Sequence, residues 1–428
     1  MRVDERTPVP HNFAPVDSDL QVLESEPVSP DTPAPGRFES LVRRTAPLRT
    51  RLGLGPVEGD SVKIWVLSRF AMAVITWAVI WTGFGYTTKQ PRGWASVWQR
   101  WDWLRYYNIA AHGYSLRQRH GASIAFFPGY PALLYAAHLF LRSWVYSGFA
   151  LSFVTGGLAC IALSRIIALE AAAVLGADKA RQAAREGLTL FVWAPAAVFM
   201  TAGYTEGPFL ACALWGWLAA RRNNWLLSGI LLAGASAIRI NGLFVLVAVG
   251  ILFLQSRPRG LRGWLGSWPL ALPLVPVAGF FVYLHSLTGS WNAWEHAESN
   301  GWNRHLSYPW HTLAETWHYA FGRYLIAENA WEYQLELVVT FMGFGLLIWL
   351  LYKRRWAEFV YILLSVGTLA TSHVYLSVSR EMLTWWPFWA ALGVWCVQRP
   401  WLKSVYLTFS APTAFAIAYM FLSGKWAG

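Results

Sequence analysis

From Ile64 onward, the chain alternates between apolar runs and short polar segments. Most of these runs are long enough to cross the hydrocarbon core of a bilayer, which takes about 20 residues in a helix. The pattern therefore predicts an all-α polytopic membrane protein with about eleven transmembrane helices. The runs begin near Ile64, Trp144, Leu188, Thr205, Trp225, Asn241, Trp264, Tyr333, Ala357, Glu381 and Trp401.

Lysine and arginine clusters between these runs indicate how the chain is oriented. All of them fall on one side of the membrane if the chain alternates from a cytoplasmic N-terminus, as the positive-inside rule requires. This agreement supports both the number of runs and the cytoplasmic N-terminus. The clusters are the basic stretch before the first run, Lys179 with Arg181 and Arg185, Arg221 with Arg222, Arg257 with Arg259 and Arg262, Lys353 with Arg354 and Arg355, and Arg399 with Lys403.

The apolar run from Phe126 to Leu141 does not fit this alternation as a span. Counting it would move Lys179 and Arg185 to the outside. The run is short and opens with two prolines, so we expect a helix that lies along or dips into the outer membrane face. Two long loops then lie outside the cytoplasm, at about residues 87–143 and 286–332.

The first sixty residues differ in composition from the rest. Residues 1–36 hold seven acids and seven prolines without apolar periodicity, which predicts a disordered tail. Residues 37–63 are basic and precede the first span. We expect residues 1–60 to remain cytoplasmic and uncleaved, with the basic stretch against anionic headgroups. Residues 61–428 then form the transmembrane domain.

The overall composition agrees with a membrane protein. Hydrophobic residues make up 55% of the chain and charged residues only 14%, with a mean hydropathy of +0.33, whereas soluble domains have about 25% charged residues. The three cysteines fall in apolar runs at unrelated spacings, which argues against a disulfide framework, a zinc site and a thiol nucleophile. The net charge of +12 follows the predicted topology, so no nucleic-acid partner is expected.

The first outside loop carries an aspartate in an unusual setting. Asp102 lies between Trp101 and Trp103, and Arg100 and Arg105 flank it. A poorly hydrated carboxylate among indoles at a membrane surface suits a general base that deprotonates a sugar hydroxyl. The alternative is an interfacial helix whose aromatic residues anchor to headgroups and whose Asp102 pairs with Arg105. We favour the catalytic interpretation.

The arginines of this loop run against the positive-inside trend. A planar guanidinium binds phosphate through two hydrogen bonds, so these residues suit a phosphate ligand. Contact with lipid headgroups is the alternative use of each. The arginines are Arg100, Arg105, Arg117 and Arg119.

Further polar residues lie at turns that open to the same side. Glu206 follows Tyr204 and Thr205 at the end of a run, where the alternative is an acid stabilised by a helix dipole. Arg239 ends a short run, and an ionisable residue at such a membrane position is a functional hypothesis. We expect the anion that binds Arg239 to be a substrate phosphate rather than Asp102 or Glu206.

The last of these turns holds His373 and Arg380. The alternatives here are an interfacial histidine and a simple ion pair of Arg380 with Glu381. The second loop is rich in indoles and histidines, which suit either sugar stacking or membrane anchoring, and their irregular spacing does not predict a metal site. These residues are Trp291, Trp294, Glu295, His296, Glu298, Trp302, His305, Trp310, His311 and Trp317.

Glycine-rich nucleotide-binding motifs of the two common types do not occur in the sequence. A glycosyltransferase with this chain would therefore use a lipid-linked donor from outside the cytoplasm.

A series of short motifs runs through about residues 60–255. It comprises Arg100-Trp101-Asp102, Ile109-Ala110 with His112-Gly113-Tyr114, Ala125-Phe126-Phe127-Pro128 with Tyr130-Pro131, Pro195 with Phe199, Tyr204-Thr205-Glu206, and Ala237 with Arg239 and Asn241-Gly242. The series resembles the PIG-V-like mannosyltransferases, relatives of the enzyme that adds the second mannose to glycosylphosphatidylinositol (GPI) anchors. Thr205 stands where that family usually has serine.

The resemblance implies a GT-C fold and an inverting transfer of mannose from polyprenyl-phosphate mannose to a lipid or glycolipid acceptor. In that scheme Asp102 deprotonates the acceptor hydroxyl, and Arg239 or Arg380 stabilises the departing phosphate. No cofactor is required, and a divalent metal is compatible with the sequence but not demanded by it. The other residues implied to bind donor phosphate or substrate are Arg105, His112, Tyr114, Glu206, Asn241 and His373.

The expected location is an integral membrane protein with an extracytoplasmic active site. The proline-rich tail and frequent Trp, Arg and Ala suggest a high-GC bacterium, and hence its plasma membrane. The expected partners are the polyprenyl-phosphate sugar, the acceptor and membrane lipids. The main alternative is a polytopic transporter or lipid flippase, which would hold its charges in a midplane cavity and often show repeated halves.

Overall fold

In the computed structural model, the described residues are 55–84, 93–115, 123–258, 260–322 and 327–427, and all their regular structure is helical. The predicted tail therefore lies almost entirely outside the described residues, as do Arg117, Arg119 and Arg259. The α-helices are α3 (Pro56–Phe84), α4 (Asp102–His112), α5 (Gly129–Leu141), α6 (Trp144–Leu175), α7 (Ala177–Val192), α8 (Glu206–Arg221), α9 (Trp225–Ile238), α10 (Gly242–Gln255), α11 (Gly260–Leu265), α12 (Leu274–Thr288), α13 (Ala293–Trp302), α14 (Pro309–Phe321), α15 (Ala327–Tyr352), α16 (Trp356–Ala370), α17 (Val378–Glu381), α18 (Trp386–Gln398) and α19 (Trp401–Leu422). Short 3₁₀ helices are η1 (Trp94–Trp98), η3 (Ala197–Met200), η4 (Trp268–Ala271) and η5 (Met382–Thr384).

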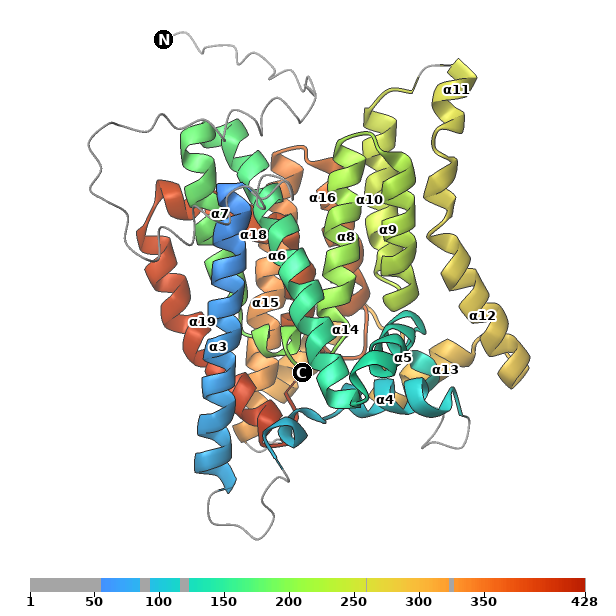
Figure 1. Cartoon of the computed structure of the whole chain (residues 1–428), viewed down its shortest axis with the longest axis vertical. Coiled ribbons are helices and arrows are strands. Elements are labelled where there is room, and N and C mark those ends of the chain that lie inside the picture. The colour runs from blue at the N-terminus through green and yellow to red at the C-terminus, as the bar shows by residue number, and fades with distance from the viewer. Residues whose placement is uncertain (1–54, 85–92, 116–122, 259, 323–326, 428) are drawn as a thin grey trace.

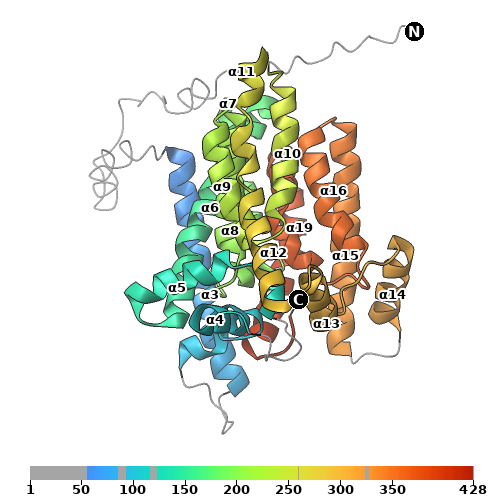
Figure 2. The same cartoon turned by 90° about the vertical axis from the view of Figure 1, so that its right-hand side faces the viewer.

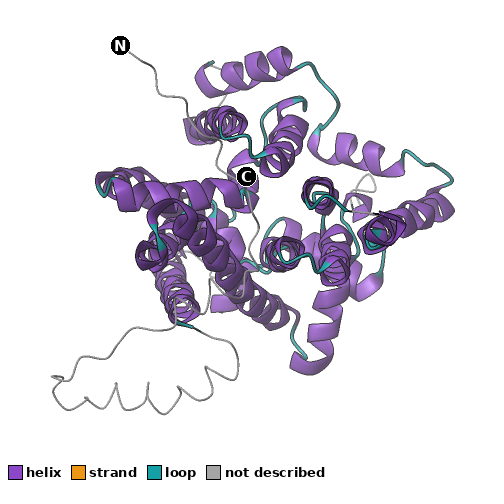
Figure 3. Cartoon of the chain, turned by 90° about the horizontal axis from the view of Figure 1, so that it is seen from above, coloured by secondary structure: helices purple, strands orange, loops and turns teal. Residues whose placement is uncertain are grey.

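The long helices run side by side between two ends of the molecule (Figures 1 and 2). Seen from above, several of them are viewed nearly end on (Figure 3). Helices α4, α5 and α13 gather at the lower end of Figure 1, and α11 lies at the upper end. We call the lower end the site end, since it carries Asp102, and the upper end the basic end.

Five helical segments of the described residues are long and apolar enough to cross a membrane. Four further apolar helices, α5, α9, α10 and α16, are shorter. Together with the absence of strands from the described residues, these segments confirm the predicted class, an all-α polytopic membrane protein. The five segments are Pro56–Thr82, Trp144–Leu175, Gly263–Thr288, Asn329–Tyr352 and Trp401–Leu422.

The apolar run predicted to begin near Leu188 is not a separate helix. α7 begins earlier, at Ala177, and ends at Val192, after which turns and the short η3 lead down to α8. Pro195 explains this break, because proline lacks an amide hydrogen and its ring clashes with the preceding helical turn. The helix therefore ends before Pro195, and the irregular segment after it carries Tyr204 to the site end.

Several of the lysines and arginines predicted to face the cytoplasm pair with acids at the basic end. Glu170 of α6 binds Arg221 of α8 at 2.8 Å and Arg355 before α16 at 3.0 Å. Arg181 of α7 binds Asp60 of α3 at 2.8 Å. These ion pairs bring together helix ends that the charge pattern had placed on one side of the membrane.

The run from Phe126 to Leu141 forms α5, whose 13 residues are fewer than the roughly 20 that a spanning helix needs. α5 packs against α4 and the start of α6 at the site end (Figure 1). Tyr130 of α5 is buried against Tyr106 of α4, with ring centroids 4.7 Å apart. The two short helices therefore form one unit beneath the ends of the longer ones.

Candidate active site

A cavity of about 1160 Å³ lies at the site end. Its lining comes from α4, α13, the turn between α9 and α10, and residues 368–381. The lining contains both aromatic and charged side chains, among them Trp294, Trp302 and Asp102. Such a mixture of flat apolar surfaces and convergent polar groups is typical of small-molecule sites.

Asp102 is the first residue of α4, where the helix dipole favours a negative charge. The preceding Trp101 has a φ of 49°, an uncommon backbone conformation for a residue with a side chain. The Trp101 indole N–H donates a hydrogen bond to the carbonyl of Lys425 at 3.2 Å, which holds this turn against the end of the chain. The Asp102 carboxylate accepts a hydrogen bond from Arg380 Nη1 at 2.7 Å. It therefore pairs with Arg380 rather than with the neighbouring Arg105.

Glu206 lies at the centre of the site's charges, and its side chain is completely buried. One carboxylate oxygen, Oε1, accepts a hydrogen bond from Arg380 Nε and lies 3.5 Å from Arg239 Nη1. Glu206 is the first residue of α8, so it also benefits from that helix's dipole. It does not line the cavity but lies behind it, between two arginines that do.

Arg239 is held by a second carboxylate as well. Its Nη2 donates to Glu381 Oε2 at 3.0 Å, and Asn241 donates to the other oxygen of Glu381 at 2.8 Å. The tight turn between α9 and α10 that presents both residues requires Gly242, because a Cβ there would lie 2.4 Å from the backbone nitrogen of Ser236. Arg239 thus contacts two carboxylates of the protein, Glu206 and Glu381, and its predicted phosphate contact stays a prediction.

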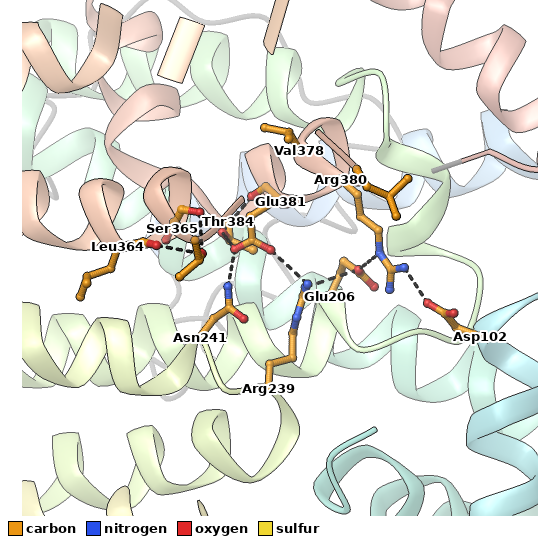
Figure 4. A network of polar contacts seen from close by, with 12 residues as sticks. Asp102, Glu206, Arg239, Asn241, Leu364, Ser365, Val378, Arg380, Glu381 and Thr384 are labelled. Carbon is orange, nitrogen blue, oxygen red and sulfur yellow. Dashed lines mark hydrogen bonds and ion pairs between the residues drawn. The ribbon is translucent and has the colours of Figure 1, made fainter. Parts of the chain in front are cut away.

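These five side chains form a continuous chain of contacts, which we call the carboxylate–arginine network (Figure 4). Arg380 and Glu381 are adjacent in sequence, yet each pairs with residues of other elements, so the simple ion pair considered above is not formed. The network consists of Asp102, Arg380, Glu206, Arg239 and Glu381, in order of contact.

Arg380 remains charged although it is buried. Burial opposes the charge, but the adjacent carboxylates of Glu206 and Asp102 outweigh it and hold the pKa of Arg380 well above its ordinary value. The guanidinium also lies 4.8 Å from the ring centroids of both Phe199 and Tyr204, within the range of cation–π attraction. A permanent cation is thus fixed beside Asp102.

Glu336 of α15 holds the short helix α17 in place. Its carboxylate accepts hydrogen bonds from the backbone N–H groups of Val378 at 2.6 Å and Ser379 at 3.1 Å, and from the Ser379 hydroxyl at 2.8 Å. These are donors that a helix start leaves without intrahelical partners. Glu336 therefore orients Arg380 and Glu381 from outside the network. Sequence reasoning missed it, although an acid inside an apolar run is the signal that marks such residues.

The structure brings together some of the residues predicted from sequence and separates others. The cavity is lined by Asp102, Arg105, Arg239, Asn241 and Arg380, with Glu206 directly behind them.

The other three predicted residues lie away from the cavity lining. His112 is exposed at the end of α4. The Tyr114 hydroxyl donates to the carbonyl of Phe126 at 2.6 Å and so ties the first loop together. His373 stacks on His305, which does line the cavity, with ring centroids 4.9 Å apart. In the described part of the chain, no cluster of three His, Cys, Asp or Glu side chains has the arrangement of a metal site.

The fold and this site define an integral membrane protein with a buried network of charges beside a large cavity at one end of its helices. The chain is similar to three curated rodent proteins, each named GPI alpha-1,6-mannosyltransferase 2. It is 36% identical to the protein of Cricetulus griseus over 190 residues, which cover 42% of this chain and 34% of that protein. It is also 36% identical to the proteins of Mus musculus over 182 residues and Rattus norvegicus over 167 residues.

These matches cover about a third of the length of each relative and about 40% of this chain. They confirm the resemblance to the PIG-V-like mannosyltransferases that the motifs predicted. No family model matches the chain.

Proposed function

We propose that this chain is a membrane mannosyltransferase of the inverting type. It would take mannose from polyprenyl-phosphate mannose and transfer it to a lipid or glycolipid acceptor. The observation that carries the proposal is Asp102, which faces a cavity of about 1160 Å³ and is held by a buried arginine. The named activity of the similar rodent proteins supports the choice of mannose.

The chemistry follows from the position of the Asp102 oxygens. Oδ2 is bound by Arg380, and among the described residues Oδ1 accepts no hydrogen bond, so it is available to an acceptor hydroxyl. As the hydroxyl oxygen forms a bond with the anomeric carbon, its proton moves to Asp102. The bond from that carbon to the phosphate oxygen breaks on the opposite face, and the electron pair leaves with the polyprenyl phosphate. Phosphate needs no protonation to leave, so one carboxylate suffices where glycosidases use two.

The proposed orientation puts the site end outside the cytoplasm, because the basic end carries the lysine and arginine clusters. The similar proteins are mammalian, so the bacterial plasma membrane suggested by composition stays a prediction.

Single-cysteine labelling in a background without the native cysteines tests this orientation. Cysteine at exposed His296 of α13 is expected to react with a membrane-impermeant reagent added to intact cells. Cysteines at exposed Lys179 and Arg354 of the basic end are expected to react only after the membrane is opened. Labelling of a cysteine at Lys179 in intact cells would show that the orientation is the reverse of the one proposed, or that α5 spans the membrane.

Transfer itself is tested with purified protein in liposomes that contain radiolabelled polyprenyl-phosphate mannose and lipids extracted from the producing cells. Label is expected to move from the donor to a second lipid that resists the mild acid which cleaves the donor. If the label stays on the donor while the protein moves that donor between leaflets, the chain is a flippase and the proposal is wrong.

A further inference from the structure

A second group of basic side chains lines the cavity, apart from the carboxylate–arginine network. Arg304 and His305 follow Asn303, the residue that caps the end of α13, and both line the cavity. The ring of His305 stacks on that of His373, which supports it from the segment before α17. We call Arg304 and His305 the second-loop basic pair.

Arg304 is poorly satisfied by the protein. Its Nη1 lies 3.6 Å from Glu298 Oε2, and its Nη2 donates to the carbonyl of Leu376 at a long 3.4 Å. Its Nε is shielded from solvent and has no hydrogen-bond partner among the described residues. A guanidinium offers five N–H donors, and shielded donors in folded proteins nearly always have a partner. Arg304 thus has free capacity to bind an anion.

The arginines of the network differ from Arg304 in this respect. Arg380 binds the carboxylates of Glu206 and of Asp102, the latter at 2.7 Å, and Arg239 contacts those of Glu206 at 3.5 Å and Glu381 at 3.0 Å. The network contains three carboxylates and two guanidinium groups, which leaves 3 − 2 = 1 negative charge in excess. An anionic phosphate would have to displace carboxylates there and approach a net negative charge, which Coulomb repulsion disfavours.

Glu298 does not neutralise Arg304 as fully as the network acids neutralise their arginines. Burial raises the pKa of Glu298, Arg304 offsets that rise only in part, and the charge of Asp102 adds to it. Glu298 and Arg304 line the same cavity as Asp102. The pair at 3.6 Å is therefore an ion pair that a stronger anion can replace.

We propose that Arg304, assisted by His305, binds the phosphate of the polyprenyl-phosphate sugar, while Arg380 and Arg239 position Asp102 and Glu206. The identity of the sugar in this inference rests on the proposed function, whereas the phosphate contact rests on the surroundings of Arg304. Phosphate must leave from the face of the sugar opposite to the attacking hydroxyl. Arg239, Arg380 and Arg304 line the cavity from elements other than that of Asp102, and of these three only Arg304 lies outside the carboxylate–arginine network. Two parallel N–H donors on phosphate oxygens would stabilise the charge that develops there as the bond to the anomeric carbon breaks.

Binding of radiolabelled polyprenyl phosphate to the purified protein tests the proposal without any transfer reaction. Arg304→Gln is expected to weaken binding by about 10- to 100-fold, as the loss of charge-assisted hydrogen bonds does. Arg304→Lys keeps the positive charge but cannot donate two parallel hydrogen bonds to a phosphate. Its affinity for polyprenyl phosphate is expected to lie between those of Arg304→Gln and the unmodified protein. Arg222→Gln, which removes an exposed arginine at the basic end, is the matched control and is expected to bind like the unmodified protein.

Competition experiments separate the phosphate from its lipid and from the fold. Uncharged polyprenol competes with radiolabelled polyprenyl phosphate for the lipid part of the site. Its affinity is expected to be the same for the two Arg304 variants and the unmodified protein, because it makes no phosphate contact. Inorganic phosphate and anionic phospholipid vesicles show whether a free phosphate or any lipid headgroup satisfies the site. An unchanged melting temperature checks folding.

Equal binding of polyprenyl phosphate by Arg304→Gln and the unmodified protein would overturn the inference. The inference would also fail if Arg304→Gln lost affinity for polyprenol as much as for polyprenyl phosphate. If binding depends on Arg304 but no mannose is transferred, the phosphate site stands and the proposed function fails. If mannose is transferred equally well without Arg304, the phosphate site fails and the proposed function stands.

Discussion

Replacement of Asp102 by asparagine is expected to lower mannose transfer by about 10²- to 10⁴-fold, the usual contribution of a general base. The two side chains have nearly the same shape, and asparagine retains an oxygen that can accept the hydrogen bond from Arg380 now made at 2.7 Å. What it loses is the ability to take the proton of the acceptor hydroxyl. The measurement is the initial rate of transfer in liposomes.

Donor binding and folding serve as controls for this variant. Because Arg304 rather than Asp102 is assigned to the phosphate, polyprenyl phosphate is expected to bind Asp102→Asn about as well as the unmodified protein. A transfer rate within a few-fold of the unmodified protein would assign Asp102 to structure and leave the site without its base.

Glu206→Gln is expected to produce the largest loss of stability. Glu206 is completely buried and binds both Arg380, which is buried, and Arg239, which is 20% exposed. The neutral amide removes one of the two carboxylates that each arginine contacts, so Arg380 keeps only Asp102 and Arg239 keeps only Glu381. Breaking a buried ion pair from one side costs about 3–5 kcal/mol. We expect a lower melting temperature in detergent and, at a temperature where the fold survives, a reduced transfer rate.

Glu170→Gln is the matched control, since Glu170 also binds two arginines, Arg221 and Arg355, but at the basic end. Its side chain is 19% exposed, so water can compensate part of the lost charge and a smaller fall in melting temperature is expected. Transfer by the surviving folded protein is expected to stay near normal. Equal effects of the two substitutions on transfer would mean that Glu206 has no role specific to the site.

The end of the molecule at which the site lies could be predicted from the sequence, because lysine and arginine mark one end of each helix. The polar residues Asp102, Glu206, Arg239 and Arg380 then had to share the other end, and the structure brings all four into contact. The lengths of the helices were harder to predict from the sequence. The run at Leu188 looked continuous, but Pro195 lies in a segment of turns whose apolar side chains are buried by neighbouring helices.

Pairing within the site could not be predicted, because hydropathy contains no information about which helices are neighbours. Glu206 binds arginines 33 and 174 residues later in the chain, and no spacing rule connects them. Glu381 was not considered as a partner of Arg239, because it looked like a local partner of Arg380 alone. Arg304 was overlooked for a related reason. It was singled out by a shielded N–H group without a hydrogen-bond partner among the described residues, and only a folded structure reveals such a group.

During biosynthesis, the carboxylate–arginine network is completed late. Asp102 emerges from the ribosome 278 residues before Arg380, and Arg239 emerges 142 residues before Glu381. Until α17 is inserted, Glu206 has from the network only Arg239, at 3.5 Å, and Asp102 lacks its arginine. An uncompensated buried charge is costly, so the site end closes only when the last third of the chain docks onto the first. Assembly of the carboxylate–arginine network is in this way coupled to docking of α17. A chain that ends before α17 lacks Arg380 and Glu381 and leaves two carboxylates of the network with one arginine.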